Sequence, residues 1–351
     1  MAPPAPRPVR PVARWRDRLP GLGVAVSLAV VAALVGTALP VVGGPVSGVV
    51  LGVLVGALLR RRTGNAEALA PGVAVASRLV LQVAVVLLGA RLSLAQVAEV
   101  GRSSLPVMLG TVVLCLVGAA VLGRLLGVHG ELRALIGTGT AICGASAIAA
   151  VTPVVRASGT NVAYALSTIF AFNLAAVVVF PPLGQLLGMG QEVFGLFAGT
   201  AVNDTSSVVA AATTYGATAA DHAVVVKLVR TLLIIPIVVG LSLLVARRDR
   251  RATGADGGTA RPPVRRLVPW FLVGFLLLAT VNSLGLVPGT WHGPLATTAG
   301  FLITVALTAI GLSTDVPALR AAGLRPLLLD GMLWLLVTLS ALALIAVTGP
   351  A

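Results

Sequence analysis

The feature that most constrains this chain is a succession of eleven long apolar segments. They lie near residues 22–39, 45–59, 72–90, 105–126, 132–155, 162–187, 193–213, 222–246, 267–287, 295–312 and 327–348. Only 10% of the residues are charged, against roughly 25% in a soluble domain. A stretch of about 20 apolar residues crosses a bilayer as a helix. The sequence therefore predicts an all-α, polytopic transmembrane helix bundle of about 10–11 spans.

Polar stretches divide the chain into four parts. Residues 1–20 are rich in Pro and Arg and lack the cleavage site of a signal peptide, which indicates a disordered basic cytoplasmic tail. Residues 21–246 hold eight of the segments and both small-polar stretches described below. Residues 247–266 (RRDRRATGADGGTARPPVRR) are predicted to form a flexible cytoplasmic linker, and residues 267–351 hold the final spans.

Basic residues are distributed unequally around the segments. If the N-terminus is cytoplasmic and the segments alternate in direction, 19 of the 25 Lys and Arg residues fall inside and 3 fall outside. The remaining three, Arg78, Lys227 and Arg230, lie within segments. Because basic residues favour the cytoplasmic side, we predict a multi-pass cell-membrane protein with a cytoplasmic N-terminus. This topology explains the net charge of +14 without a nucleic-acid partner.

Two apolar segments contain related stretches of small and polar residues. GTAICGASAIAA (139–150) and GTAVNDTSSVVA (199–210) align at a constant offset of 60 residues with five identities. Glycines permit a break in a helix, and irregular backbone at membrane depth is tolerated where it is buried in protein or lines a cavity. Close helix packing through small residues is the alternative. The repetition favours broken or re-entrant helices.

The order of the segments predicts inverted-topology repeats, as in secondary transporters. A looser, gapped match links residues 92–101 with residues 312–323, and the segments that precede these two stretches are seven apart. Segments five and seven are only two apart, however, so simple alternation gives them the same direction. A true inverted pair requires that one of the two be re-entrant or that the span count between them be different.

The two stretches predict a binding site for a small anion. A broken helix presents backbone N–H groups and a positive dipole end at the start of its second half. The candidate substrate-binding residues here are Gly139, Thr140, Cys143, Gly144, Ser146, Thr200, Asn203, Thr205 and Ser206. Lys227 and Arg230, at i and i+3 on one helix face, would add positive charge to the site. Snorkelling of both side chains to the surface is the alternative.

Charged and polar residues elsewhere in the segments receive separate predictions. A carboxylate within a span is by default a functional hypothesis, so Asp204 is expected to couple a proton or Na+, or to hold a buried cation until substrate displaces it. Its alternative is a helix N-cap. We expect Asp330 and His222 to be interfacial, Arg78 to snorkel, and Asn173 to bond between packed helices.

Motifs for other chemistry are absent from the sequence. The chain has no P-loop, HExxH or GxSxG motif and no paired Cys or His cluster. We therefore expect no enzymatic activity, no catalytic residues, no metal and no cofactor.

The quoted stretches resemble the sulfate exporter family of bacterial membrane transporters. The resemblance rests on GTGTAICGASAIAA, FAGTAVNDTSSVVAAA, VKLVRTLLIIPIVV and IGLSTDVPALRAAGLRPLLL, and it extends from about residue 45 to 345. It implies the architecture of cation–proton antiporters and bile-acid symporters. The family's small-polar motif maps onto Ile142–Ser146, and its Lys and Arg pair onto Lys227 and Arg230. Its second motif commonly has His where Asn203 stands, which shifts a proton role toward Asp204.

The prediction is a secondary transporter, most simply an exporter, of a small inorganic or organosulfur anion such as sulfate. A passive anion channel, or a cation- or proton-coupled transporter of another substrate, is the alternative. The implied partners are the anion, a coupling proton or Na+ and the lipid bilayer, and a homo-oligomer remains open.

Overall fold

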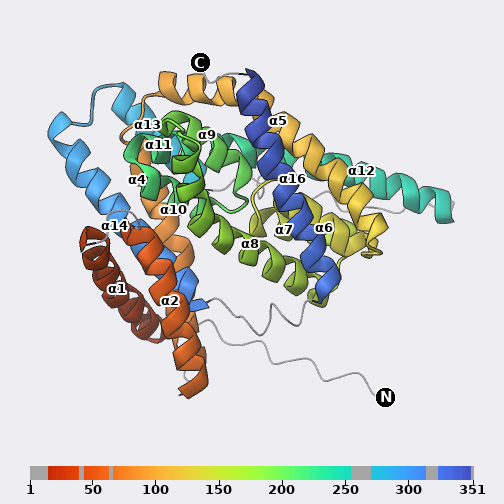
Figure 1. Ribbon diagram of the computed structural model, residues 1–351, viewed down its shortest axis with the longest axis horizontal. Helices are drawn as coiled ribbons and strands as arrows, with labels where there is room; N and C mark the ends of the chain where they lie inside the picture. The colour runs from red at the N-terminus through yellow and green to blue at the C-terminus, as the bar shows by residue number, and fades with distance from the viewer. Residues whose placement is uncertain (1–14, 39–42, 63–65, 254–269, 314–322, 349–351) are drawn as a thin grey trace. The chain divides into compact units, whose positions relative to one another are not determined.

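The computed structural model describes residues 15–38, 43–62, 66–253, 270–313 and 323–348, and helices are the regular elements in this part of the chain (Figure 1). In chain order they are α1 (Trp15–Ala38), α2 (Gly43–Arg62), α3 (Ala66–Val75), the π-helix η1 (Ala76–Val80), α4 (Leu81–Gly89), α5 (Leu94–Leu125), α6 (Gly130–Ala141), α7 (Ala145–Val155), α8 (Gly159–Leu186), α9 (Gln191–Ala201), α10 (Thr205–Tyr215), α11 (Ala217–Leu232), α12 (Ile234–Thr253), α13 (Trp270–Ser283), α14 (Gly289–Ser313) and α16 (Leu324–Thr348).

The prediction of an all-α, polytopic membrane bundle is confirmed. Seven helical stretches of the described chain are long and apolar enough to cross a membrane. The ends of the predicted polar parts differ from expectation. Helix α1 begins at Trp15, inside the predicted tail 1–20, and α12 continues to Thr253, inside the predicted linker 247–266. The other residues of the tail and linker, and most of the gapped match at 312–323, lie outside the described residues.

The chain divides into two compact units, Met1–Leu81 with Thr304–Thr314, and Gln82–Ile303 with Asp315–Ala351. In the first unit, glycines let helices approach closely, as is common in membrane bundles. A methyl group at Gly21 would meet the backbone of α3, and one at Gly52 would meet the backbone of α14. Both small-polar stretches lie in the second unit, which holds the candidate site.

Helices α6 and α7 form a helical hairpin, here called hairpin 1 (residues 130–155). The Asn161 amide of α8 donates to the Glu131 carboxylate at the start of α6, at 3.1 Å. Deeper along the same pair, a methyl group on Gly139 would meet Ile169. Since both contacts join residues thirty apart, α6 and α8 run parallel. The intervening helix α7 must therefore return the chain to the side from which α6 started.

Helices α9 and α10 form the second hairpin, hairpin 2 (residues 191–215). The Thr218 backbone N–H donates to the Gln191 side chain at 3.1 Å, and the Tyr215 hydroxyl donates to the Met189 carbonyl at 2.5 Å. The residues that precede the hairpin therefore lie beside the residues that follow it. The rings of Phe194 and Tyr215 also stack, with centroids 3.8 Å apart.

The two hairpins begin at opposite ends of α8. Hairpin 1 precedes this helix and hairpin 2 follows it after a short turn, and Figure 1 shows α6 and α7 near one end of α8 and α9 toward the other. A helix of 28 residues is about 42 Å long, whereas an arm of 11 or 12 residues is about 17 Å long. Each arm is therefore about half as long as the hydrocarbon core of a bilayer is thick. The sequence alignment at offset 60 corresponds to an inverted pair of hairpins.

Candidate functional site: the tips of the two hairpins

The tips of the hairpins meet around two buried cations of α11. Lys227 and Arg230 are both 0% exposed. The Lys227 Nζ donates to the carbonyl oxygens of Ile142 and Val202, at 2.8 Å each. These two acceptors are sixty residues apart and hold equivalent positions in the two hairpins. A single ammonium group therefore joins the tips.

Arg230 makes a similar bridge one turn further along α11. Its Nε donates to the Ala141 carbonyl at 2.9 Å, and its Nη1 donates to the Thr200 carbonyl. Snorkelling, the alternative expected from the sequence, does not occur for either cation. Arg78 is exposed on η1, and its snorkelling stays a prediction.

Helix ends explain why these cations can be buried without a carboxylate beside them. The last carbonyls of a helix have no intrahelical partner, and they carry the negative end of the helix dipole. The four acceptors of Lys227 and Arg230 belong to the ends of α6 and α9. Among the described residues, no carboxylate lies within ion-pair distance of either cation. The carbonyls thus supply the compensation that a buried charge requires.

The break in each hairpin has its own chemistry. In hairpin 1, Gly144 has φ +65° and ψ −121°, a conformation that essentially only glycine adopts. In hairpin 2, Val202 and Asp204 are extended, and the Asp204 carboxylate accepts from the backbone N–H and the hydroxyl of Ser206. Asp204 is therefore the N-cap of α10. The equivalent position at the start of α7 is Gly144, which offers no side-chain cap.

Several buried polar groups near the tip of hairpin 2 have no partner in the described residues. The Asn173 Oδ1 on α8 accepts from the backbone N–H groups of Asn203 and Asp204, at 3.2 Å each, but its Nδ2 is free. Both polar atoms of the Asn203 side chain are free, as is the Arg230 Nη2. Such groups are uncommon in folded proteins and each requires an explanation.

The interfacial position predicted for Asp330 on α16 is wrong. We expected an interfacial carboxylate, but the side chain is 0% exposed and accepts from the Thr140 hydroxyl at 2.7 Å. The error arose because Asp330 is only six residues from the start of α16, although α5, α6, α8 and α9 cover that helix. A carboxylate within an apolar stretch was the available signal.

The other predicted residues take varied positions. Gly139 lies against α8 and leaves room for Ile169. The Thr200 hydroxyl donates to carbonyls of its own helix, and the Thr200 carbonyl accepts from Arg230. Cys143 is buried, and its sulfur accepts from the Ser146 hydroxyl at 2.9 Å. Ser146 is exposed and Thr205 is half-buried, which leaves the starts of α7 and α10 partly accessible.

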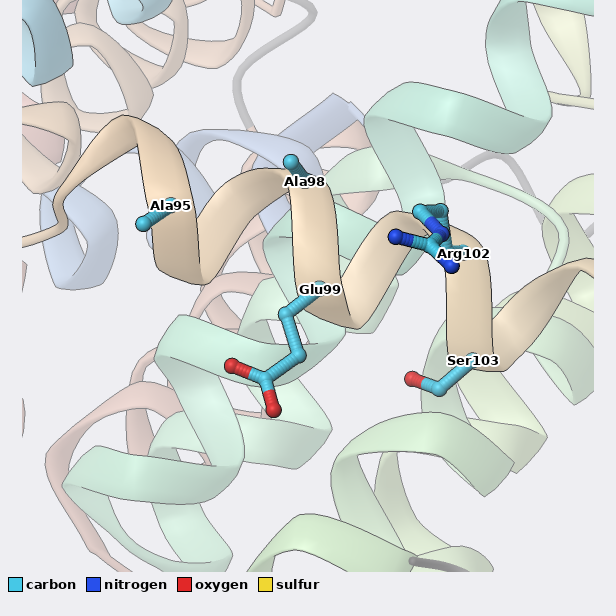
Figure 2. Close-up of a pocket in the computed structure, with 5 residues that line it drawn as sticks. All are labelled: Ala95, Ala98, Glu99, Arg102 and Ser103. Carbon is cyan, nitrogen blue, oxygen red and sulfur yellow. The ribbon is translucent and has the colours of Figure 1, made fainter.

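Two further observations concern ligands. The described residues contain no group of three or more His, Cys, Asp or Glu side chains that could hold a metal ion. A surface hollow of about 590 Å³ lies along α5, as Figure 2 shows, and shares no residue with the hairpin tips. It is lined by the exposed residues Ala95, Ala98, Glu99, Arg102 and Ser103.

Comparison with known proteins identifies the relatives of this chain. A family model described as "Conserved hypothetical protein 698" matches residues 20–330. The UPF0324 membrane protein SpyM3_0740 of Streptococcus pyogenes serotype M3 is 40% identical over 331 residues, which cover 93% of this chain and 96% of the relative. The UPF0324 membrane protein SAG1125 of Streptococcus agalactiae serotype V is 38% identical, covering 95% of this chain and 99% of the relative. No solved structure matches. The chain belongs to the UPF0324 family of multi-pass membrane proteins.

Proposed function

We propose that this protein is a secondary transporter of a small anion, which binds where the tips of hairpins 1 and 2 meet. The observation that carries the proposal is the set of unpartnered N–H donors, from Asn173, Asn203 and Arg230, buried beside two cations. An anion would satisfy these donors, whereas a cation would not. The uncapped start of α7 adds backbone N–H groups and a positive dipole end.

The arrangement of the hairpins supports a transport mechanism. Inverted repeats with discontinuous helices that meet near the midplane are the architecture of many secondary transporters, in which the site is exposed alternately to either side. Lys227 lies ten residues into α11, about 15 Å along its axis, which is half the thickness of a hydrocarbon core. Asp204, which caps α10, would hold the tip of hairpin 2 until substrate competes for the nearby donors.

We propose that the N-terminus is cytoplasmic. If both hairpins are re-entrant, Arg156 lies on the inner side of the membrane, whereas simple alternation of the segments places it on the outer side. The Lys and Arg residues outside the spans then number 20 inside and 2 outside, a stronger asymmetry than simple alternation gives. Nine of the eleven apolar segments would then cross the bilayer.

Among substrates, we place sulfate or an organosulfur acid first and export as the direction. The resemblance to sulfate exporters supports this choice, as does the set of buried N–H donors at the hairpin tips. The same resemblance supports a distant relationship to cation–proton antiporters and bile-acid symporters.

Flux measurements in proteoliposomes test the proposal. Purified protein would be offered radiolabelled sulfate, sulfite, thiosulfate or taurine under imposed pH or Na+ gradients. We expect accumulation of at least one anion above its equilibrium level. Downhill flux without accumulation would indicate a passive channel, and no flux above empty liposomes would contradict the anion assignment.

A further inference from the structure

The buried carboxylate of Asp330 has no assigned task in the mechanism above. Its Oδ1 accepts from the Thr140 hydroxyl of α6, and its Oδ2 has no partner among the described residues. The Thr168 hydroxyl of α8 lies near this carboxylate, but it donates to the Ala165 carbonyl of its own helix at 3.1 Å. Two hydroxyl groups therefore lie near this carboxylate, one on α6 of hairpin 1 and one on the neighbouring helix α8.

In the part of the chain that the structure describes, no Lys or Arg lies within ion-pair distance of the Asp330 carboxylate. Among the helices packed on α16, α5 places the Cys115 thiol near Asp330, and α6 and α8 place hydroxyl groups near it. The acidic residue of α9, Glu192, lies at the far end of that helix from the tip. Arg230 of α11 is close enough to act on Cys115, but its Nε and Nη1 bind hairpin carbonyls. An ionised carboxylate in such a place is costly, and a bound proton removes the charge.

Asp330 is also connected to the moving parts of the proposed site. Thr140, its hydrogen-bond partner, belongs to the last turn of α6. The next two residues, Ala141 and Ile142, supply carbonyls to Arg230 and Lys227. A change of charge on Asp330 therefore acts on hairpin 1 directly beside the two residues whose carbonyls bind the cations.

We propose that Asp330 is a reversible proton-binding site that controls how hairpin 1 packs against α16, and that it thereby couples proton movement to transport. In the packing described here, the carboxyl group holds the proton. When hairpin 1 separates from α16, water reaches Oδ2 and accepts the proton. The group binds one proton from one side and releases one proton to the other, and no covalent bond other than O–H changes. The coupling to transport rests on the proposed function, but proton binding does not.

Infrared difference spectroscopy of the protein in lipid bilayers tests proton binding without a substrate. Each of the 11 Asp and Glu side chains gives a C=O stretch when it is protonated, and across a pH titration of the wild type we expect one of these bands to come from Asp330. This signal should be lost in Asp330→Asn and retained in Asp204→Asn and in Asp221→Asn. Asp221 is a matched control because it pairs with Arg91 at 3.4 Å, away from the hairpin tips. Persistence of the full signal in Asp330→Asn would overturn the proposal.

Measurements of sulfate flux then distinguish proton coupling through Asp330 from anion transport itself. In Asp330→Asn, we expect sulfate exchange to continue while accumulation driven by a pH gradient falls to the equilibrium level. Unchanged pH-driven accumulation, or accumulation driven by Na+ alone, would overturn the role of Asp330 and leave the anion transporter intact. Absence of all anion flux in the wild type would instead refute the proposed function, and the infrared signal would still decide whether Asp330 binds a proton.

Discussion

The carbonyl oxygens of Ile142 and Val202 accept hydrogen bonds of equal length, 2.8 Å, from one ammonium group. The two residues occupy equivalent positions in hairpins that enter from opposite ends of α8. Lys227, which supplies the ammonium group, therefore lies where the two halves of an inverted repeat meet. Any rearrangement that separates the hairpin tips must break at least one of these bonds.

Replacement of Lys227 by Met tests this bridge. The substitution keeps most of the volume but removes both donors, so two buried carbonyls lose their partner. We expect a loss of about 1–3 kcal/mol in the free energy of unfolding together with loss of anion flux. Thermal unfolding in detergent and proteoliposome flux would measure the two effects. Unchanged stability with full transport would show that the bridge is dispensable.

Asn203→Leu separates binding from folding. Both polar atoms of Asn203 are buried without a partner in the described residues, so an apolar side chain of similar size removes no hydrogen bond. We expect equal or greater thermal stability, and an increase of about tenfold in the KM for the anion, equivalent to about 1.4 kcal/mol. A marked loss of stability with unchanged KM would show that Asn203 is structural rather than part of the binding site.

Gly144→Ala tests the break in hairpin 1. An added Cβ conflicts with the positive φ of this residue, and forcing such a conformation costs about 1–3 kcal/mol. We expect reduced stability and impaired flux. Gly159→Ala is the matched control, because Gly159 begins α8 and a methyl group there would meet no atom within 4 Å. Equal behaviour of the two variants would contradict the role assigned to Gly144.

Amine labelling offers an independent view of the site, because Lys227 is the only lysine of the chain. Its complete burial predicts that an amine-reactive reagent modifies it slowly in the closed protein. Transported anion should change that rate, since the site opens alternately during a transport cycle. Mass spectrometry of the peptide that contains Lys227 would measure the reaction. Rapid labelling that is independent of anion would contradict the closed packing of the tips.

The sequence predicted the helices better than their directions. Apolar segments and the glycine-rich stretches around Gly144 indicated the spans and the breaks, because both depend on local composition. Hydropathy does not distinguish one span of about 24 residues from two arms of about 12 residues, since both are equally apolar. The re-entrant course depends on contacts such as that of Asn161 with Glu131. The burial of Asp330 likewise depends on neighbouring helices and has no local signature.

The proposed mechanism requires that both hairpins be re-entrant and that they begin on opposite sides of the membrane. Single cysteines at Thr160 and Leu187, both exposed, would be placed in a protein that lacks Cys115 and Cys143 and labelled with an impermeant maleimide from either side of the membrane. Re-entrant hairpins predict labelling of Thr160→Cys from the cytoplasmic side and of Leu187→Cys from the outer side. Labelling of Thr160→Cys from outside and Leu187→Cys from inside, as alternating spans require, would contradict this arrangement.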